Sequence, residues 1–175
     1  MWHPIKHFIL ITKHRHKVIK YCFKAGIGLQ GLKHDLSKYS LTEFIVGMKY
    51  YSGKRSPNAV EIEKYGYSKA WLHHSGRNKH HFEYWVDYDK VSGSFKPIKM
   101  PLRYVKEMFC DRVAATKIYQ KKAYNDSSAL EYFISRNEDN ALHKDTRELL
   151  VSWLTLLKDK GEKETFKIVK NTKKY

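Results

Sequence analysis

The amino-acid sequence predicts an all-α protein that folds as a single-domain helical bundle. Its 175 residues suit one domain with a sizeable hydrophobic core. Apolar residues make up 42% of the chain, which is too many for a disordered segment. Only 9 Gly and 4 Pro are present, too few for the many turns of a β-sandwich or barrel. We see no internal repeat or low-complexity linker and expect one domain over residues 1–175.

The first half of the chain is expected to be helical apart from its glycine-rich breaks. Apolar residues near helical spacing and local capping patterns predict helices over residues 5–25, 30–38, 40–51 and 59–75. Gly26 is expected to end the first of these helices. Ser40 and Glu43 form a capping-box pattern, in which each side chain caps a backbone N–H of the other residue.

The second half begins with a less regular region. Residues 76–89 are rich in His and aromatic side chains and are expected to be irregular, and residues 91–99 form a polar loop. Pro101 suits the first turn of a long helix that runs to about residue 122. Further helices are expected over residues 129–137, 144–158 and 162–171. Gly161 separates the last two helices.

The net charge and the cysteine content limit the kinds of partner and the cellular compartment that we expect for this protein. The formal net charge is +16, which predicts affinity for anions such as nucleotides or nucleic acid. The two cysteines form no CxxC motif, so we expect free, buried thiols in a reducing compartment. No stretch approaches the ~20 apolar residues of a membrane span. We therefore expect a cytoplasmic protein without membrane association, whose oligomeric state stays open.

The strongest chemical signal is the adjacent pair His34 and Asp35. Asp35 is the first acidic residue in a strongly basic N-terminal segment. Imidazole nitrogen and carboxylate oxygen together suit Zn, Fe, Mn or Ni. Lys38 follows within one helical turn, so a helix here would place its ammonium group over the face that carries the pair. A metal site beside a cation is suited to holding and polarising a phosphate.

Two further histidine pairs lie close together in the sequence. His73-His74 and His80-His81 frame a short polar segment that contains Arg77. One member of each pair can face inward while the other faces water. We expect at least one of these rings to serve a metal or a phosphate. The guanidinium group of Arg77 is suited to gripping phosphate oxygens.

His16 and Asp111 are the remaining candidates. His16 precedes His34 by 18 residues, a separation that lets two antiparallel helices bring the rings together. The alternative to metal binding is that His16 is a solvated side chain on a Lys-rich helix. Asp111 lies on or beside the apolar stripe of its helix, where a carboxylate is costly unless it is paired or metal-bound. Its alternative is an ion pair with a basic side chain. Glu107, one turn earlier, is a candidate to support the ligands from outside.

The order of these residues resembles that of the HD-domain metal-dependent phosphohydrolases. His16, the His34-Asp35 pair and Asp111 match that order. The segment HDLSK at 34–38 is similar to the frequent His-Asp-(Ile/Leu)-Gly-Lys form, with Ser in place of Gly. The chain also resembles an uncharacterised bacterial and phage family with HDLSK…EF and HH…NxHHxEYW signatures, the latter ending here at Asn78–Trp85.

The resemblance implies an HD-like helical bundle, with a metal-site core at about 14–115 and C-terminal helices at 129–171. It implies one or two divalent ions, either Fe, Mn, Zn, Ni or Co. The implied metal ligands are His16, His34, Asp35, Asp111, His73 and His80. Phosphate-binding or acid–base roles in catalysis would fall to Lys38, His74, Arg77 and His81. The implied reaction is hydrolysis of a small phosphorylated substrate, a nucleotide, by a metal-activated water. The doubled histidine pairs leave open which rings bind metal and how many ions bind.

Two alternatives belong to other functional classes. One is a non-catalytic nucleic-acid-binding protein, built on the basic helix 13–24 and the Lys-rich C-terminus, which leaves the His-Asp order unexplained. The other is a His-Asn-His nuclease with Asn78 between the two histidine pairs. That site needs a β-hairpin before a helix, whereas residues 59–72 are expected to be helical.

Overall fold

A computed structural model describes residues 2–136 and 141–175, and these residues are mostly helical, which confirms the predicted class. The α-helices of the described chain are α1 (Pro4–Lys24), α2 (Gly28–Gly31), α3 (Leu41–Lys49), α4 (Pro57–Tyr65), α5 (Lys69–Ser75), α6 (Leu102–Gln120), α7 (Ser128–Ser135) and α8 (Lys144–Asn171). Short 3-10 turns are η1 (Leu36–Tyr39), η2 (Phe82–Tyr84) and η3 (Lys121–Ala123), and the strands are β1 (Val86–Asp89) and β2 (Ser94–Pro97).

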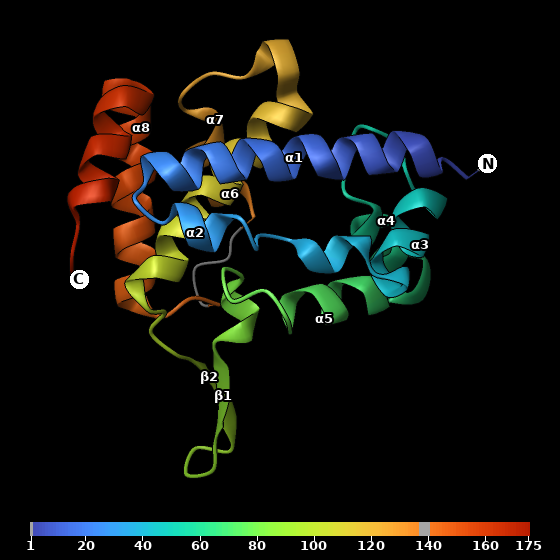
Figure 1. The fold of residues 1–175 in the computed structure, drawn as a ribbon. Coiled ribbons are helices and arrows are strands. Elements are labelled where there is room, and N and C mark those ends of the chain that lie inside the picture. The colour runs from blue at the N-terminus through green and yellow to red at the C-terminus, as the bar shows by residue number, and fades with distance from the viewer. Residues whose placement is uncertain (1, 137–140) are drawn as a thin grey trace.

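The long helix α1 spans the molecule and organises the fold (Figure 1). It packs on α2, α3 and α6, while α7 and α8 pack on α6. The core lies among α1, α6 and α8, where Phe109 makes edge-on ring contacts with Trp153 at 5.9 Å and Phe166 at 5.5 Å. Burying a side chain of this size stabilises the fold by roughly 1.5–3 kcal/mol. This core fixes the relative positions of α1 and α6, which both contribute to the site described below.

The segment around the His34-Asp35 pair is not the helix that the sequence predicted over residues 30–38. Helix α2 ends at Gly31, and both residues of the pair lie in the turn before η1. Asp35 has a left-handed backbone with φ 53°, which a continuous right-handed helix cannot contain. Aspartate tolerates this conformation better than most residues. Gly31 lets α2 approach α1, because a Cβ there would lie 2.4 Å from the Cβ of Cys22.

The helix predicted over residues 59–75 is two helices. Gly66 ends α4 with φ 80°, a conformation that favours glycine. Ser68 then caps α5 by accepting a hydrogen bond from the backbone N–H of Trp71 at 2.9 Å. The carboxylate of Glu61 accepts from the Ser68 hydroxyl at 2.5 Å and so joins the two helices. The break turns α5 and its histidines toward the centre of the molecule.

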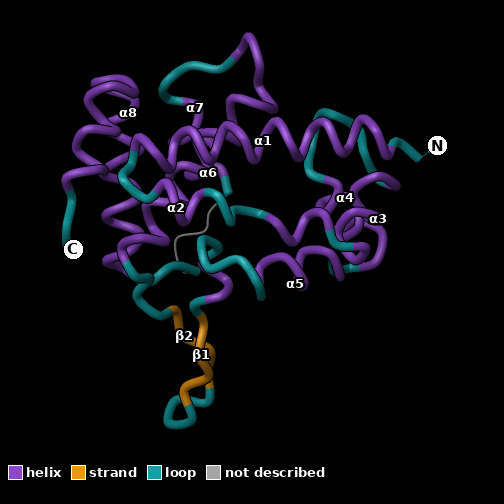
Figure 2. The backbone as a smooth tube through the Cα atoms, in the orientation of Figure 1, coloured by secondary structure: helices purple, strands orange, loops and turns teal. Residues whose placement is uncertain are grey.

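Residues 86–97 form an antiparallel hairpin where the sequence predicted irregular structure and a polar loop. Strand β1 pairs with β2 in a register that places Tyr88 opposite Phe95, with the two rings 5.4 Å apart. Gly93 has φ 66° in the turn between the strands. The hairpin projects from the helical body (Figure 2), so its alternating apolar residues stay exposed. Two four-residue strands are too short for their alternation to stand out in the sequence.

The C-terminal helices follow the sequence more closely. Helix α8 contains both predicted helices, 144–158 and 162–171, with a break at Gly161, where φ is 71° and ψ is 176°. Helix α7 confirms the predicted helix over residues 129–135, with Arg136 as its C-cap, and residue 137 lies outside the described residues. Cys22 and Cys110 are free and buried, as expected. Within the described chain, no helix is long and apolar enough to cross a membrane.

Gly47→Ala is expected to destabilise the protein. An added Cβ would lie 1.9 Å from Nε2 of the buried His7 ring, so the ring or α3 must shift. Overpacking of this kind costs about 1–3 kcal/mol, which exceeds the ~1 kcal/mol that alanine gains over glycine in a helix. Denaturant unfolding should show a lower free energy of unfolding. In a His7→Ala background the same change should cost nothing, and equal costs in both backgrounds would contradict this packing argument.

Candidate metal centre

A cluster of buried polar side chains lies where α1, the turn before η1, α5, the loop after α5 and α6 meet. His34, Asp35 and His74 are each 1% exposed, and His80 is 2% exposed. Burying this many ionisable groups is expensive unless each finds a partner. The candidate ligand atoms of the described residues form three groups. Two groups of four share Asp35, and the third consists of His34, His80 and Glu107.

The first group, here called the first subsite, consists of His14, His34, Asp35 and Asp111. His14 Nε2 lies 2.9 Å from Asp111 Oδ1 and 3.7 Å from Asp35 Oδ2. His34 Nε2 lies 3.2 Å from Asp35 Oδ2 and 3.6 Å from Asp111 Oδ1. Atoms that share a metal ion at 2.0–2.2 Å lie roughly 3–3.6 Å apart in tetrahedral geometry. The spacing of these four atoms is therefore close to that of a coordination shell.

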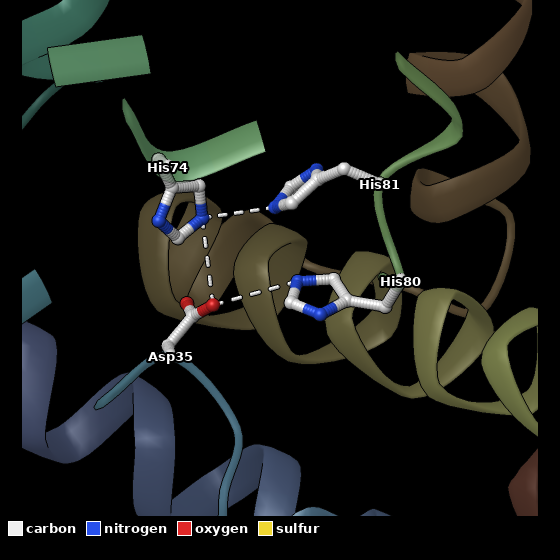
Figure 3. Close-up of side chains that lie close together, drawn as sticks. All are labelled: Asp35, His74, His80 and His81. Carbon is white, nitrogen blue, oxygen red and sulfur yellow. Dashed lines mark hydrogen bonds and ion pairs between the residues drawn. The ribbon is translucent and has the colours of Figure 1, made fainter. Parts of the chain in front are cut away.

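The second subsite consists of Asp35, His74, His80 and His81 (Figure 3). Asp35 Oδ1 lies 3.4 Å from His74 Nε2 and 3.4 Å from His80 Nε2. His81 Nε2 lies 2.9 Å from His74 Nε2. His74 comes from α5, while His80 and His81 come from the loop that follows it. The two oxygens of Asp35 thus face different subsites.

The chemistry of these atoms fits divalent ions. Five of the inward-facing atoms are buried and contact other ionisable side chains of the cluster or Lys38, namely His14 Nε2, His34 Nε2, His80 Nε2 and both carboxylate oxygens of Asp35. Buried polar atoms are rarely left unsatisfied, and imidazole nitrogens with carboxylate oxygens suit first-row divalent metals. The two subsites are therefore compatible with one ion each, and nothing in them identifies the metal.

Two carboxylates hold the ligand rings from outside. Glu107 Oε1 lies 2.9 Å from His34 Nδ1, and Glu43 Oε2 lies 2.8 Å from His74 Nδ1. When Nδ1–H donates to a carboxylate, Nε2 is left with its lone pair for a metal. Glu43 also lies 2.7 Å from Nδ1 of His73 through its other oxygen. Glu107 was anticipated from the sequence as an outer support.

The role of Glu43 was missed because its sequence context predicted a capping box. Ser40 makes no side-chain cap, and Glu43 turns to α5 instead. Glu43 is only 7% exposed, and the free-energy cost of burying its charge is offset by the contacts with the two histidines. The signal available in the sequence was its place in the HDLSK…EF signature.

The electrostatics of Asp35 favour its ionised form. Burial opposes ionisation, but His34, Lys38 and His74 outweigh it and hold the pKa of the Asp35 carboxyl well below its usual range. Lys38 Nζ lies 2.5 Å from Asp35 Oδ2. Burial lowers the pKa of Lys38, whereas Asp35 and Asp111 raise it, and the net result is a raised pKa. Lys38 is therefore a fixed cation at the edge of the first subsite.

The structure corrects the assignment of the ligand on α1. His16 is exposed and belongs to neither subsite, and His14 lies there instead. His14 shares the buried face of α1 with Ile11 and Val18, three residues before it and four after. That periodicity could have identified His14 from the sequence, because it marks the face that turns inward.

The histidine pairs also divide differently from the expectation. His74 and His81, expected to act in catalysis, supply atoms to the second subsite together with His80. His73, expected as a metal ligand, contacts Glu43 and is outside both subsites. Arg77 is exposed, and its guanidinium group lies 3.4 Å from the backbone oxygen of His73. Of the other predicted ligands, His34, Asp35 and Asp111 lie together in the first subsite, and His80 lies with Asp35 in the second.

Alanine substitutions at His14 and His16 should show which of the two histidines of α1 binds metal. His14→Ala removes one of four first-subsite atoms, so metal affinity there should fall by at least the 10- to 100-fold typical of losing an outer support. His16→Ala, two residues away on the exposed face, should leave metal content unchanged. Metal analysis of both purified variants is the measurement. Loss of metal in His16→Ala with full retention in His14→Ala would refute the assignment from the structure.

The hairpin bears on the His-Asn-His nuclease alternative. That site requires a hairpin before a helix, with the metal between them. In the described chain the hairpin β1–β2 follows both histidine pairs. Asn78 instead donates to Ser37 Oγ at 2.8 Å and to the backbone oxygen of His74 at 2.8 Å, so it supports the α5 end.

Among the comparisons with known proteins, only the one with protein-family models gave a match. Neither the curated proteins nor the solved structures gave a match. One family model matches residues 3–156, a span that includes every residue of both subsites. The chain therefore belongs to the family described as "Family of unknown function (DUF5662)".

Proposed function

We propose that this protein is a metal-dependent phosphohydrolase that acts on a phosphate ester, with nucleotides as the substrate class. The observation that carries the proposal is the convergence of buried imidazole nitrogens and carboxylate oxygens on Asp35, with the Lys38 ammonium group 2.5 Å from one of its oxygens. Divalent ions bound there would polarise a phosphoryl group and lower the pKa of a coordinated water. Iron, manganese, zinc, nickel and cobalt all suit such a set of nitrogen and oxygen atoms.

The side-chain exposures indicate where a substrate would enter. The side chains of His34, Asp35, His74 and His80 are at most 2% exposed, whereas that of Asp111 is 19% and that of Lys38 is 29% exposed. Solvent therefore reaches the first subsite at Asp111 and Lys38, and His81 of the second subsite is also only partly buried. A phosphate that enters at the first subsite meets the Lys38 ammonium first, which can neutralise charge on its oxygens.

The order of the ligands supports an HD-like arrangement. They come in sequence from α1, the His34-Asp35 turn and α6, with the histidines of α5 and its following loop between them. This is the order that carried the resemblance, with His14 in place of His16. The HD-like fold is accordingly part of the proposal.

The nucleic-acid-binding alternative explains the net charge of +16 but does not explain why the candidate ligand atoms are buried together. A surface that only attracts phosphates has no need of a buried carboxylate surrounded by histidines, because a carboxylate repels anions and is costly to bury. Metal-dependent hydrolysis accounts for both features.

The test uses full-length protein purified without chelator and without nickel resin. Elemental analysis should find one or two equivalents of a divalent transition metal. A screen of nucleotides should show phosphate release that a chelator removes and added metal restores. Protein that stays metal-free and inactive in the presence of each candidate metal, while binding DNA or RNA with steep salt dependence, would support the alternative instead.

A further inference from the structure

The side chain of Glu107 lies between the two halves of the candidate metal centre. Its Oε1 atom lies 2.9 Å from Nδ1 of His34 and 3.3 Å from Nδ1 of His80. His34 belongs to the first subsite and His80 to the second, and their ring centroids are 4.4 Å apart. One carboxylate oxygen therefore contacts one histidine of each subsite.

The second oxygen of Glu107 keeps the side chain in this position. Gln30, on α2, donates a hydrogen bond to Oε2 at 2.5 Å and another to the backbone oxygen of Arg103 at 3.2 Å. Glu107 is only 5% exposed, so water cannot readily replace these partners. Because both of its oxygens are engaged, the carboxylate is not free to turn toward one ring and leave the other.

We infer that Glu107 couples the two subsites, so that a divalent ion in one raises the affinity of the other. The inference rests on the proposed metal centre. When Oε1 accepts from both Nδ1–H groups, both rings present Nε2 toward their subsites. Because Gln30 holds Glu107 against both rings, an ion that orients His34 acts on His80 through the shared Oε1 atom. The second ion then meets a ring that is already ordered, and the effect must be reciprocal.

Glu43 offers a matched control within the same chain. It is also a buried carboxylate that contacts two histidine Nδ1 atoms, those of His73 and His74. Only His74 belongs to a subsite, so Glu43 supports the second subsite alone. Both variants keep the shared carboxylate of Asp35, so any difference between them reports on Glu107 itself.

The experiment titrates metal-free, full-length protein with Co²⁺ and follows binding by visible absorption and calorimetry. The wild type should bind two ions. Its affinity for the second ion should be higher than the affinity that the same subsite would have if the two subsites were independent. Glu107→Gln, which keeps the shape and removes the charge, should weaken both steps by about 10- to 100-fold and reduce the coupling to what the shared Asp35 carboxylate supplies. Glu43→Gln should weaken only one step. Circular dichroism and the melting temperature of the metal-free variants establish that they are folded.

The outcomes separate this inference from the proposed function. If Glu107→Gln weakens a single step, or keeps the coupling, Glu107 does not link the subsites. Two independent ions in the wild type would overturn the coupling and leave the metal centre standing, whereas a wild type that binds no Co²⁺ would overturn both. Should Glu107→Gln fail to fold, Gln30→Ala takes its place, because it frees Oε2 and should reduce the coupling. Unchanged coupling in Gln30→Ala would then overturn the inference.

Discussion

Asp35→Ala is expected to abolish metal binding at both subsites and, with it, phosphohydrolase activity. Asp35 is the one residue that the described chain places in both four-membered ligand groups. Each of its oxygens faces a different subsite, so a single substitution removes one ligand atom from each. The loss in affinity at each subsite should exceed the roughly 10- to 100-fold that follows removal of an outer support. Elemental analysis and phosphate release measured on the same preparation should fall together.

Two further variants make this result interpretable. Asp35→Asn keeps the size of the side chain and tolerates the left-handed backbone, so it separates loss of charge from loss of fold. It should also lose metal, because an amide presents one neutral oxygen in place of two charged ones. Asp87→Ala removes an exposed carboxylate on the hairpin and should change neither metal content nor activity. Full metal occupancy in folded Asp35→Asn would show that the carboxylate is a structural partner of Lys38.

Lys38→Ala is expected to retain metal and lose catalytic efficiency. An ammonium group cannot ligate a cation, and Lys38 lies at the exposed edge of the first subsite. A cation bound by Asp35 Oδ2 would compete with Lys38 for that oxygen, which leaves the ammonium group available to a phosphate. Loss of a hydrogen bond to a charged group costs about 1.5–3 kcal/mol. This corresponds to a decrease in kcat/KM of roughly 10- to 100-fold.

The controls for Lys38 test charge and geometry separately. Lys38→Arg should restore only part of the activity, because the planar guanidinium group presents its donors differently from a compact ammonium group. Lys33→Ala removes an exposed lysine from the same segment and should have no effect on kcat/KM. Wild-type kcat/KM in Lys38→Ala would exclude a role in substrate binding. Loss of metal in that variant would instead mean that Lys38 holds the turn around Asp35.

The helical class and the main candidate ligands could be identified from the sequence because their signals are local. Apolar residues at helical spacing define α1, α6 and α8, whatever the rest of the chain does. The adjacency of His34 and Asp35 and the placement of Asp111 beside an apolar stripe are also visible without a structure. In each case the informative residues lie within a few turns of one another.

The tertiary structure decided which rings face inward and which carboxylates support them. His14 lies in the first subsite in place of His16 because the apolar face of α1, which His14 shares with Ile11 and Val18, packs toward α6. Glu43 contacts His73 of α5 across 30 residues of sequence. Glu107 was expected to support the site, but its partner His34, 73 residues away, became known only from the structure. No local pattern encodes contacts of that separation, because they exist only once the packing of α1, α3, α5 and α6 has brought the segments together.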